Sequence, residues 1–171
     1  GSIFKMITAL AAWESWVTNT TEQVYDSGVY RYYNQKLPFW YYTDYGVGHR
    51  WQNVSAAIKN SCNYYFCEMG QRLGIDKLVE YASGFGLGKK TGIELLGETA
   101  GTLATSLNNE PGNILNLSIG QGANSFSVIQ MAKYISMVAN GGKDLDVTII
   151  KSVIDENGNE IPKEQVEEVV N

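Results

Sequence analysis

Residues 1–13, G-S-I-F-K-M-I-T-A-L-A-A-W, carry the strongest structural signal in the chain. Apolar side chains occupy nearly every position of this stretch, and Lys5 is its only charge before Glu14. A helix on a protein surface would show polar residues along one face. We therefore predict a buried helix over residues 3–13, with the Ser2 hydroxyl placed to cap its free backbone N–H groups.

Ser2 and Lys5 are three residues apart, so a helix would place them on one face with Cβ atoms about 5–6 Å apart. A serine hydroxyl is a poor nucleophile until a neighbouring base removes its proton. A lysine can act as that base only when neutral, and apolar surroundings lower its pKa from a reference value of about 10.4. The S-x-x-K pattern alone is common by chance, because a serine cap followed by a lysine that extends to solvent gives it too.

A second candidate element, Ser61-Cys62-Asn63, lies where one helical pattern ends and the next begins. Residues two apart cannot share a helix face, but in a turn both side chains could point into one cleft. There Ser61 could relay a proton to a leaving amine, and Asn63 could hydrogen-bond a substrate amide. The alternative is that Ser61 or Asn63 only caps the helix predicted over residues 64–73.

S-x-x-K followed by S-x-N resembles the signature of penicillin-binding proteins and serine β-lactamases. Four segments, 1–12, 56–66, 87–101 and 117–142, are similar to segments of the class B penicillin-binding proteins, in that family's order. The resemblance implies a mainly α structure: the helical portion of the β-lactamase/transpeptidase-like α+β fold, with a short C-terminal β-hairpin and most of the central sheet missing. It implies one partial transpeptidase domain over residues 1–171.

The same resemblance implies a peptidoglycan D,D-transpeptidase, which attacks the D-Ala-D-Ala end of a stem peptide and passes the acyl group to an amine of a neighbouring strand. β-Lactam antibiotics mimic that dipeptide and remain attached as an acyl adduct. By motif, Ser2 is the nucleophile and its backbone N–H is half of the oxyanion hole. Lys5 is the general base, and Ser61 and Asn63 form the second motif. No metal or organic cofactor is implied.

The family's third motif, K-[ST]-G, is expected on a sheet strand after the last helix. Lys90-Thr91-Gly92 has the right letters, but it lies in the 87–101 segment and precedes Ile93-Glu94-Leu95, so we do not assign it to that motif. The chain also begins inside a helical pattern without an initiator Met. We therefore expect a fragment that is inactive alone. We also expect it to self-associate through the apolar 3–13 helix, which the missing sheet would cover.

The composition indicates one ordinary globular domain and excludes several functions. The 171 residues are 44% hydrophobic and 18% charged, with a net charge of −5 and a pI near 4.9. Without a run of Lys or Arg we expect no nucleic-acid binding, and no apolar run reaches the ~20 residues of a membrane span. The resemblance places the parent protein on the outer face of the bacterial cytoplasmic membrane. There it would be anchored by an N-terminal segment and would work with other cell-wall synthesis proteins.

Other elements follow from local patterns. Helices are expected over residues 54–60, 64–73, 75–83 and 125–139, a short helix or strand at 113–119, and a glycine-rich loop at 84–101. Gly74 should end the second of these helices, and Ser125 or Ser127 should cap the last. The β-rich stretch 147–154 with the turn Glu156-Asn157-Gly158 predicts a hairpin. The aromatic stretch 25–51 predicts a loop with short extended pieces.

The metal-binding and redox residues are few. Cys62 and Cys67 cannot form a disulfide scaffold, and their spacing on a helix predicts two free thiols. His49 is the only histidine. Without a second pair of cysteines it leaves no metal-ligand set, and we interpret it as a structural or surface residue.

Two other functions remain open. A β-lactamase or a β-lactam-sensing receptor domain would share S-x-x-K, and a lactamase would need a base to activate water. Glu94, Glu98 and Glu110 are candidates for that base by residue type only. A non-catalytic glycan-binding module would use the aromatic residues of 25–51 to stack on sugars. Aromatic clusters in loops more often form a small core beneath the loop, and this function leaves both motifs unexplained.

Overall fold

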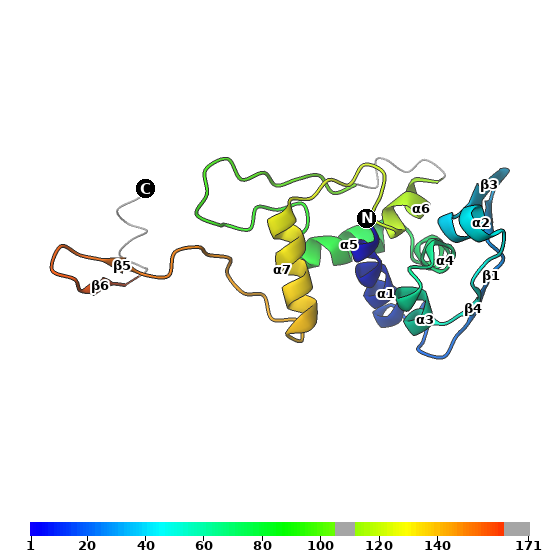
Figure 1. Cartoon of the computed structure of the whole chain (residues 1–171), viewed down its shortest axis with the longest axis horizontal. Coiled ribbons are helices and arrows are strands. Elements are labelled where there is room, and N and C mark those ends of the chain that lie inside the picture. The colour runs from blue at the N-terminus through cyan, green and yellow to red at the C-terminus, as the bar shows by residue number, and fades with distance from the viewer. Residues whose placement is uncertain (105–111, 163–171) are drawn as a thin grey trace.

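The computed structural model describes residues 1–104 and 112–162. Helices form the body of the molecule and pack around α1 (Lys5–Glu14), which continues a 3₁₀ turn at Ser2–Phe4 (Figure 1). The other helices are α2 (Trp40–Tyr45), α3 (Val54–Lys59), α4 (Asn63–Leu73), α5 (Ile75–Gly84), α6 (Asn113–Ser118) and α7 (Val128–Ala139). The strands are β1 (Val24–Asp26), β2 (Val29–Tyr32), β3 (Gln35–Pro38), β4 (Arg50–Gln52), β5 (Val153–Ile154) and β6 (Glu160–Ile161). Within the described ranges every helix is too short or not apolar enough to span a bilayer.

α1 lies at the centre of the helical body because its inner face carries small and apolar side chains. Phe4, Ala11 and Ala12 are buried, and α4 and α5 pack against the helix. Alanine side chains allow the neighbouring helices to approach closely. The buried Thr8 hydroxyl donates to the Ser118 carbonyl at 2.7 Å, so the polar group on this face is also satisfied.

The outer side of α1 differs from the prediction of a fully buried helix. Ile3 and Trp13 are 53% and 54% exposed, so no element among the described residues covers them. Gly1 occupies the N-cap position of the first turn, and no side chain caps it. The prediction that the Ser2 hydroxyl caps this helix is therefore wrong, because Ser2 lies inside the turn rather than before it.

α4 packs against both α1 and α6 and begins at the second candidate motif. Cys62 is its N-cap, and the Cys62 Sγ atom accepts a hydrogen bond from the Tyr65 N–H at 3.4 Å. Gly74, with φ of 81°, ends the helix as predicted. At Gly70 the neighbouring α6 comes so close that a Cβ atom would lie 2.4 Å from the Ser118 Cβ. The contact between α4 and α6 therefore requires glycine at this position.

The aromatic stretch between α1 and α3 is more regular than the predicted loop. β1 pairs antiparallel with β4, with Tyr25 opposite Trp51, while β2 and β3 form a separate antiparallel hairpin. The predicted short extended pieces are thus confirmed. The sequence pattern does not predict α2, because its W-Y-Y-T-D-Y residues show no alternation of apolar and polar faces. Gly46, with φ of 72°, ends this helix.

α7 holds the glycine-rich 84–101 loop against the body. The helix begins after Ser127, whose capping box with Gln130 confirms one of the two predicted caps. The buried Gln130 amide also donates to the carbonyls of Lys89 and Ala100, at 2.6 and 2.8 Å. One side chain therefore caps the helix and fixes both ends of the loop.

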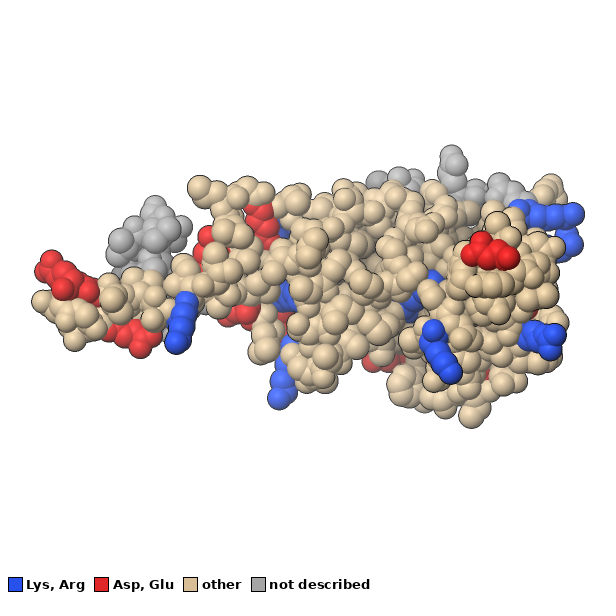
Figure 2. Space-filling model, in the orientation of Figure 1, with Lys and Arg blue, Asp and Glu red and all other residues tan. Residues whose placement is uncertain are grey.

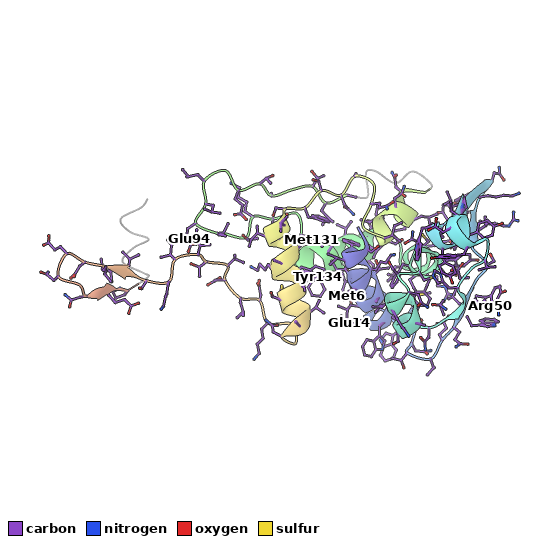
Figure 3. All side chains as sticks on the ribbon, viewed as in Figure 1. Met6, Glu14, Arg50, Glu94, Met131 and Tyr134 are labelled. Carbon is purple, nitrogen blue, oxygen red and sulfur yellow. The ribbon has the colours of Figure 1, made fainter. Side chains whose placement is uncertain are left out.

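The first turn of the chain is held by α7 and by the segment after α6. The buried Tyr134 donates its hydroxyl to the Ile3 carbonyl at 3.0 Å, and Figure 3 shows this residue on the side of α7 that faces α1. Gly120 approaches the same turn so closely that a Cβ atom would lie 2.5 Å from the Phe4 Cβ. Its φ of 71° is also one that glycine adopts readily. The turn that carries Ser2 is therefore positioned by distant parts of the chain.

The C-terminal hairpin is confirmed but is shorter than predicted. β5 and β6 pair antiparallel over two residues each, and residues 147–152 are not strand. The Asp155 carboxylate accepts hydrogen bonds from the N–H groups of Asn157 and Asn159, both at 2.8 Å, which fixes the turn. The hairpin extends away from the helical body in Figure 1. No packed core therefore favours a longer strand pairing there.

Candidate active site

Lys5 joins the two candidate motifs. Its Nζ atom lies 3.2 Å from the Ser2 hydroxyl and 2.8 Å from the Ser61 hydroxyl. It also donates to the Ser61 backbone carbonyl at 2.9 Å. Lys5 is only 3% exposed, whereas Ser2 is exposed. The structure thus brings a solvent-accessible serine, a buried amine and a second serine to one point, which we call the Ser2–Lys5–Ser61 cluster.

Burial lowers the pKa of the Lys5 amine from 10.5 to about 8, because the charged form loses its hydration. Cys62 and Cys67 lie nearby, but burial raises the pKa of each thiol to about 12. Both thiols are therefore neutral at pH 7 and give the lysine no counter-charge. With a pKa of about 8, roughly a tenth of Lys5 is neutral at pH 7. This neutral form is the one that can accept the Ser2 proton.

Ser61 adopts a left-handed backbone conformation, with φ of 49°, that residues other than glycine rarely adopt. It forms the turn between α3 and α4. Its own N–H donates to the Ile58 carbonyl at 3.1 Å, and the next N–H, that of Cys62, donates to the Ala57 carbonyl at 2.9 Å. The prediction that Ser61 or Asn63 caps α4 is wrong, because Cys62 does so. The turn therefore leaves the Ser61 hydroxyl to contact Lys5.

Asn63 is the first residue of α4 and is half-buried. Within the described part of the chain, no hydrogen bond joins its side chain to Ser2, Lys5 or Ser61. The structure thus brings three of the four predicted site residues together by hydrogen bonds. Asn63 lies two residues beyond Ser61, as the first residue of α4.

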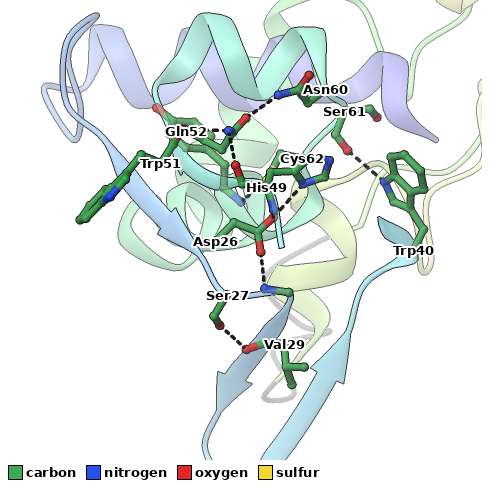
Figure 4. A network of polar contacts seen from close by, with 12 residues as sticks. Asp26, Ser27, Val29, Trp40, His49, Trp51, Gln52, Asn60, Ser61 and Cys62 are labelled. Atoms are coloured by element: carbon green, nitrogen blue, oxygen red, sulfur yellow. Dashed lines mark hydrogen bonds and ion pairs between the residues drawn. The ribbon is translucent and has the colours of Figure 1, made fainter. Parts of the chain in front are cut away.

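Next to the Ser61 turn lies a polar cluster that the sequence patterns do not indicate (Figure 4). The ligand atoms of Asp26, His49 and Cys62 all lie within 4.8 Å of one another. Asp26 Oδ2 is 2.8 Å from His49 Nδ1 and 3.3 Å from Cys62 Sγ. A carboxylate, an imidazole and a thiolate are donors that suit Zn²⁺. The prediction that His49 leaves no metal-ligand set is therefore corrected, since these three residues could hold a metal ion.

Long-range pairing explains why the sequence conceals this cluster. Asp26 ends β1 and lies opposite Arg50 in β4, so the antiparallel pair brings His49 beside it. The buried Asp26 carboxylate also accepts hydrogen bonds from the N–H groups of Gly28 and His49, at 2.6 and 3.1 Å. Cys62 then reaches the same carboxylate from the start of α4. Both cysteines are free, as predicted.

Lys90-Thr91-Gly92 lies in the loop between α5 and α6 and not on a strand. The Glu98 carboxylate accepts hydrogen bonds from the Thr91 N–H and hydroxyl, at 2.6 and 2.7 Å, and from the Gly92 N–H at 3.1 Å. These bonds close the loop on itself. Lys90-Thr91-Gly92 therefore forms a hydrogen-bonded loop, whereas the K-[ST]-G motif would have to lie on a strand.

The candidate water-activating carboxylates have other partners. Glu94 accepts hydrogen bonds from the Thr148 hydroxyl at 2.5 Å and the Ile149 N–H at 3.1 Å, near the C-terminal tail (Figure 3). Glu98 is occupied in the loop described above, and Glu110 lies outside the described residues. None of the hydrogen bonds of Glu94 and Glu98 described here reaches the Ser2–Lys5–Ser61 cluster.

The aromatic stretch 25–51 divides into an interior part and an exposed part. Tyr30 is buried, and its hydroxyl oxygen lies 2.7 Å from Glu68 Oε2 and 2.5 Å from Gln71 Oε1, so it belongs to the core. Tyr25 and Trp51 are exposed and pack edge to face across β1 and β4. The buried portion therefore fits the expectation of a small core beneath a loop.

The penicillin binding protein transpeptidase domain family matches residues 1–171. Stage V sporulation protein D of Bacillus subtilis is 38% identical over 156 residues, which cover 91% of this chain and 23% of that protein. The peptidoglycan D,D-transpeptidase MrdA of Haemophilus influenzae is 28% identical over 162 residues, which cover 89% of this chain and 24% of that protein. The chain thus spans about a quarter of the length of these curated relatives.

A solved structure shows the same fold. Pseudomonas aeruginosa PBP2, in its crystal structure with WCK 5153, superposes with a TM-score of 0.82 at 29% identity, over 95% of this chain and 39% of that one. The helices and small sheets described above therefore belong to the α+β fold of such domains, of which this chain corresponds to a part. The chain belongs to the penicillin binding protein transpeptidase domain family.

Proposed function

We propose that this chain carries the nucleophile and general base of a peptidoglycan D,D-transpeptidase that cross-links stem peptides through an acyl-enzyme on Ser2. The observation that most supports this function is the position of the Lys5 amine, within hydrogen-bond distance of the hydroxyls of both Ser2 and Ser61. A chance S-x-x-K pair would not place a second serine on the same buried amine.

The chemistry begins with the neutral Lys5 amine, which takes the Ser2 hydroxyl proton as the oxygen attacks the carbonyl of the penultimate D-Ala. The tetrahedral oxyanion forms near the Ser2 backbone N–H, which donates to it. Collapse breaks the peptide bond, and the terminal D-Ala leaves once its nitrogen has gained a proton. Ser61, which contacts Lys5 at 2.8 Å, relays that proton from the lysine ammonium to the leaving amine.

The second half-reaction reverses these proton transfers. An amine of a neighbouring strand attacks the acyl-Ser2 ester, its proton passes to Lys5, and the ester oxygen of Ser2 regains a proton as the new amide forms. Asn63, at the start of α4, hydrogen-bonds an amide of the donor peptide. A β-lactam acylates Ser2 by the same first step and stays attached, because its opened ring does not diffuse away.

The full activity belongs to a longer protein in which residues 1–171 are one partial transpeptidase domain. The curated relatives support this, because the chain spans about a quarter of their length. In this protein the domain works on the outer face of the bacterial cytoplasmic membrane, with other cell-wall synthesis proteins. The 171 residues alone are inactive, because their K-T-G lies in a loop closed by Glu98 and supplies no strand beside Ser2.

The test is labelling of the full-length protein that carries this chain with a fluorescent penicillin, followed by mass spectrometry of the modified peptide. The label should map to Ser2 and disappear in Ser2→Ala, while Ser55→Ala, an exposed serine on α3, should keep it. Slow release of the label supports a transpeptidase, whereas fast hydrolysis indicates a β-lactamase. Absence of labelling in the unmodified protein would refute the proposal. The 171-residue polypeptide should label at least about 100-fold more slowly.

A further inference from the structure

The hydroxyl of Tyr134, a residue of α7, lies at the junction between the 3₁₀ turn Ser2–Phe4 and α1. It donates to the Ile3 carbonyl at 3.0 Å. The Ile7 N–H acts as a hydrogen-bond donor to the same hydroxyl, and this bond partly opposes the rise that burial causes in the pKa of Tyr134. One hydroxyl from a distant helix therefore bonds to two backbone groups, one on each side of Lys5.

These two backbone groups are the pair that a regular α-helix would join directly. A carbonyl in an α-helix accepts from the N–H group four residues later, and Ile3 and Ile7 have this spacing. Here the residues before Lys5 form a 3₁₀ turn, in which the Lys5 N–H donates to the Ser2 carbonyl, and α1 begins only at Lys5. The Tyr134 hydroxyl thus bonds to both groups in place of the bond that would continue the α-helix into the turn.

The geometry of this turn decides how Ser2 faces Lys5. Successive side chains are about 120° apart around a 3₁₀ helix and about 100° apart around an α-helix. From Ser2 to Lys5 a 3₁₀ turn therefore completes one rotation, whereas an α-helix stops about 60° short of it. The 3₁₀ turn places Ser2 in line with Lys5, and the Ser2 hydroxyl and Lys5 Nζ lie 3.2 Å apart.

We infer that Tyr134 is a positioning residue for the reaction on Ser2, because its hydroxyl holds the 3₁₀ turn that keeps the nucleophile in line with its base. Tyr134 is fully buried, so it does not touch the substrate. Its ring packs edge to face against Phe85, with ring centroids 5.3 Å apart, and this contact holds the hydroxyl in place. Without the hydroxyl, the two backbone groups would bond to each other and the α-helical geometry would turn Ser2 away from Lys5. This inference rests on the proposed function.

Tyr134→Phe tests this role in the full-length protein that carries this chain, because it removes the hydroxyl and keeps the ring. Stopped-flow measurements with benzylpenicillin separate the dissociation constant of the first, noncovalent complex from the rate constant of Ser2 acylation. The acylation rate constant should fall by about 10- to 100-fold, the usual cost of a small misplacement of reacting groups. The dissociation constant should not change, because the buried Tyr134 does not contact the ligand.

Tyr65→Phe is the matched control. Tyr65 is also fully buried, but its hydroxyl contacts Thr18, which follows the other end of α1. Tyr65→Phe should therefore keep the acylation rate constant. Equal falls of this constant in the two variants would overturn the inference, because the loss of any buried hydroxyl would then explain them. An unchanged constant in Tyr134→Phe would also overturn it, as would a Tyr134→Phe protein that does not fold.

A crystal structure of Tyr134→Phe tests the position of Ser2 independently of acylation. It should show the Ile7 N–H bonded to the Ile3 carbonyl, and the Ser2 hydroxyl outside hydrogen-bond distance of Lys5 Nζ. A first turn identical to that of the unmodified protein would overturn the inference. Failure of the unmodified protein to react with benzylpenicillin would instead refute the proposed function.

Discussion

At the scale of single residues, Lys5 is the point on which the site depends. Its ammonium group is buried and meets two hydroxyls and one carbonyl, so it has hydrogen-bond partners but no carboxylate among them. Burial of an ammonium without a counter-charge is costly, and the folded protein reduces this cost by favouring the neutral amine. The loss of hydration at the Lys5 ammonium therefore opposes folding, and it also lowers the pKa of the amine so that it can act as a base.

Replacing Lys5 with arginine tests whether the amine must lose its proton. Arginine can still donate hydrogen bonds but stays protonated at any usable pH. In the full-length protein, Lys5→Arg should therefore lower the rate of Ser2 acylation by about 10²- to 10⁴-fold, the usual contribution of a general base. Lys59→Arg, on the exposed end of α3, is the control. A Lys5→Arg protein that kept a tenth or more of the rate would contradict the assignment.

The lowered pKa of Lys5 also predicts how stability depends on pH. The amine has a pKa of about 8 when folded and its ordinary value of 10.5 when unfolded. Below pH 8 both states are protonated and the folded state bears the full cost, roughly 3 kcal/mol for a shift of this size. Between pH 8 and 10.5 the unfolded chain binds more protons, so this group makes the protein more stable as the pH rises.

Lys5→Met removes this titration and keeps an unbranched side chain. Urea unfolding at pH 7 should give Lys5→Met a free energy of unfolding similar to that of the unmodified protein, or higher. As the pH rises to 10, the free energy of unfolding of the unmodified protein should increase relative to that of the variant. Acylation of Ser2 in the parent should rise over the same range, with a midpoint near pH 8. A stability difference that does not change with pH would show that Lys5 is charged throughout.

At the scale of elements, the contact between α4 and α6 depends on the absence of a side chain at Gly70. A Cβ atom there would meet the Ser118 Cβ at 2.4 Å and the Ser118 Oγ at 2.9 Å. Gly70→Ala should therefore destabilise the protein by about 1–3 kcal/mol, measured by chemical unfolding, because both helices would have to shift. Gly84→Ala, at the end of α5 where a Cβ meets nothing within 4 Å, should be neutral or slightly stabilising. If the two substitutions changed the free energy of unfolding equally, the effect at Gly70 would come from helix propensity and not from the contact with Ser118.

The β1–β4 pair supports a prediction about metal binding. Asp26, His49 and Cys62 provide three donors, so Zn²⁺ should displace the Cys62 thiol proton and bind. At 100 times its dissociation constant the ion would stabilise the fold by about 2.7 kcal/mol. Zn²⁺ should thus raise the melting temperature, and a chelator should reverse the rise. Mg²⁺, which prefers oxygen ligands, is the control ion.

Cys62→Ser is the matched variant for this test, because a serine can still cap α4 but is a poor Zn²⁺ ligand. It should keep the fold and lose the response to Zn²⁺. An identical Zn²⁺ response in Cys62→Ser would place the ion elsewhere.

These elements also show where sequence reasoning succeeds. α4 and α7 are predictable because their apolar spacing and end signals, such as Gly74 and Ser127, are local. The Ser2–Lys5 pair is predictable because three residues span one helical turn. α2 is not, because its residues show no pattern of apolar and polar faces. The Asp26–His49–Cys62 cluster is not, because it depends on the pairing of β1 with β4. The role of Cys62 as the α4 cap likewise depends on the left-handed Ser61 turn, which no residue pattern indicates.

At the scale of the whole molecule, the outer side of α1 forms an open apolar surface. A cavity of about 310 Å³ lies along it, lined mainly by Met6, Leu10 and Trp13 of α1 and by Val54 and Ile58 of α3. This cavity does not include the Ser2–Lys5–Ser61 cluster. Figure 2 shows mostly uncharged residues over the helical body, with acidic side chains along the C-terminal tail. None of the described residues that line this cavity carries a charged side chain, so this part of the surface lacks the charges that usually keep monomers apart.

The 171-residue polypeptide should consequently self-associate through this surface at high concentration, as the sequence predicts. Leu10→Glu places a charge in the middle of the α1 side of the cavity and should shift the polypeptide to monomers, because a dimer would then bury an unpaired carboxylate. Leu96→Glu, at a fully exposed position on the 84–101 loop, should leave the association unchanged. Sedimentation equilibrium over a range of concentrations measures both. If the unmodified 171-residue polypeptide were monomeric, the prediction that it self-associates through this surface would be wrong. If Leu10→Glu and Leu96→Glu associated equally, the contact would lie on another face.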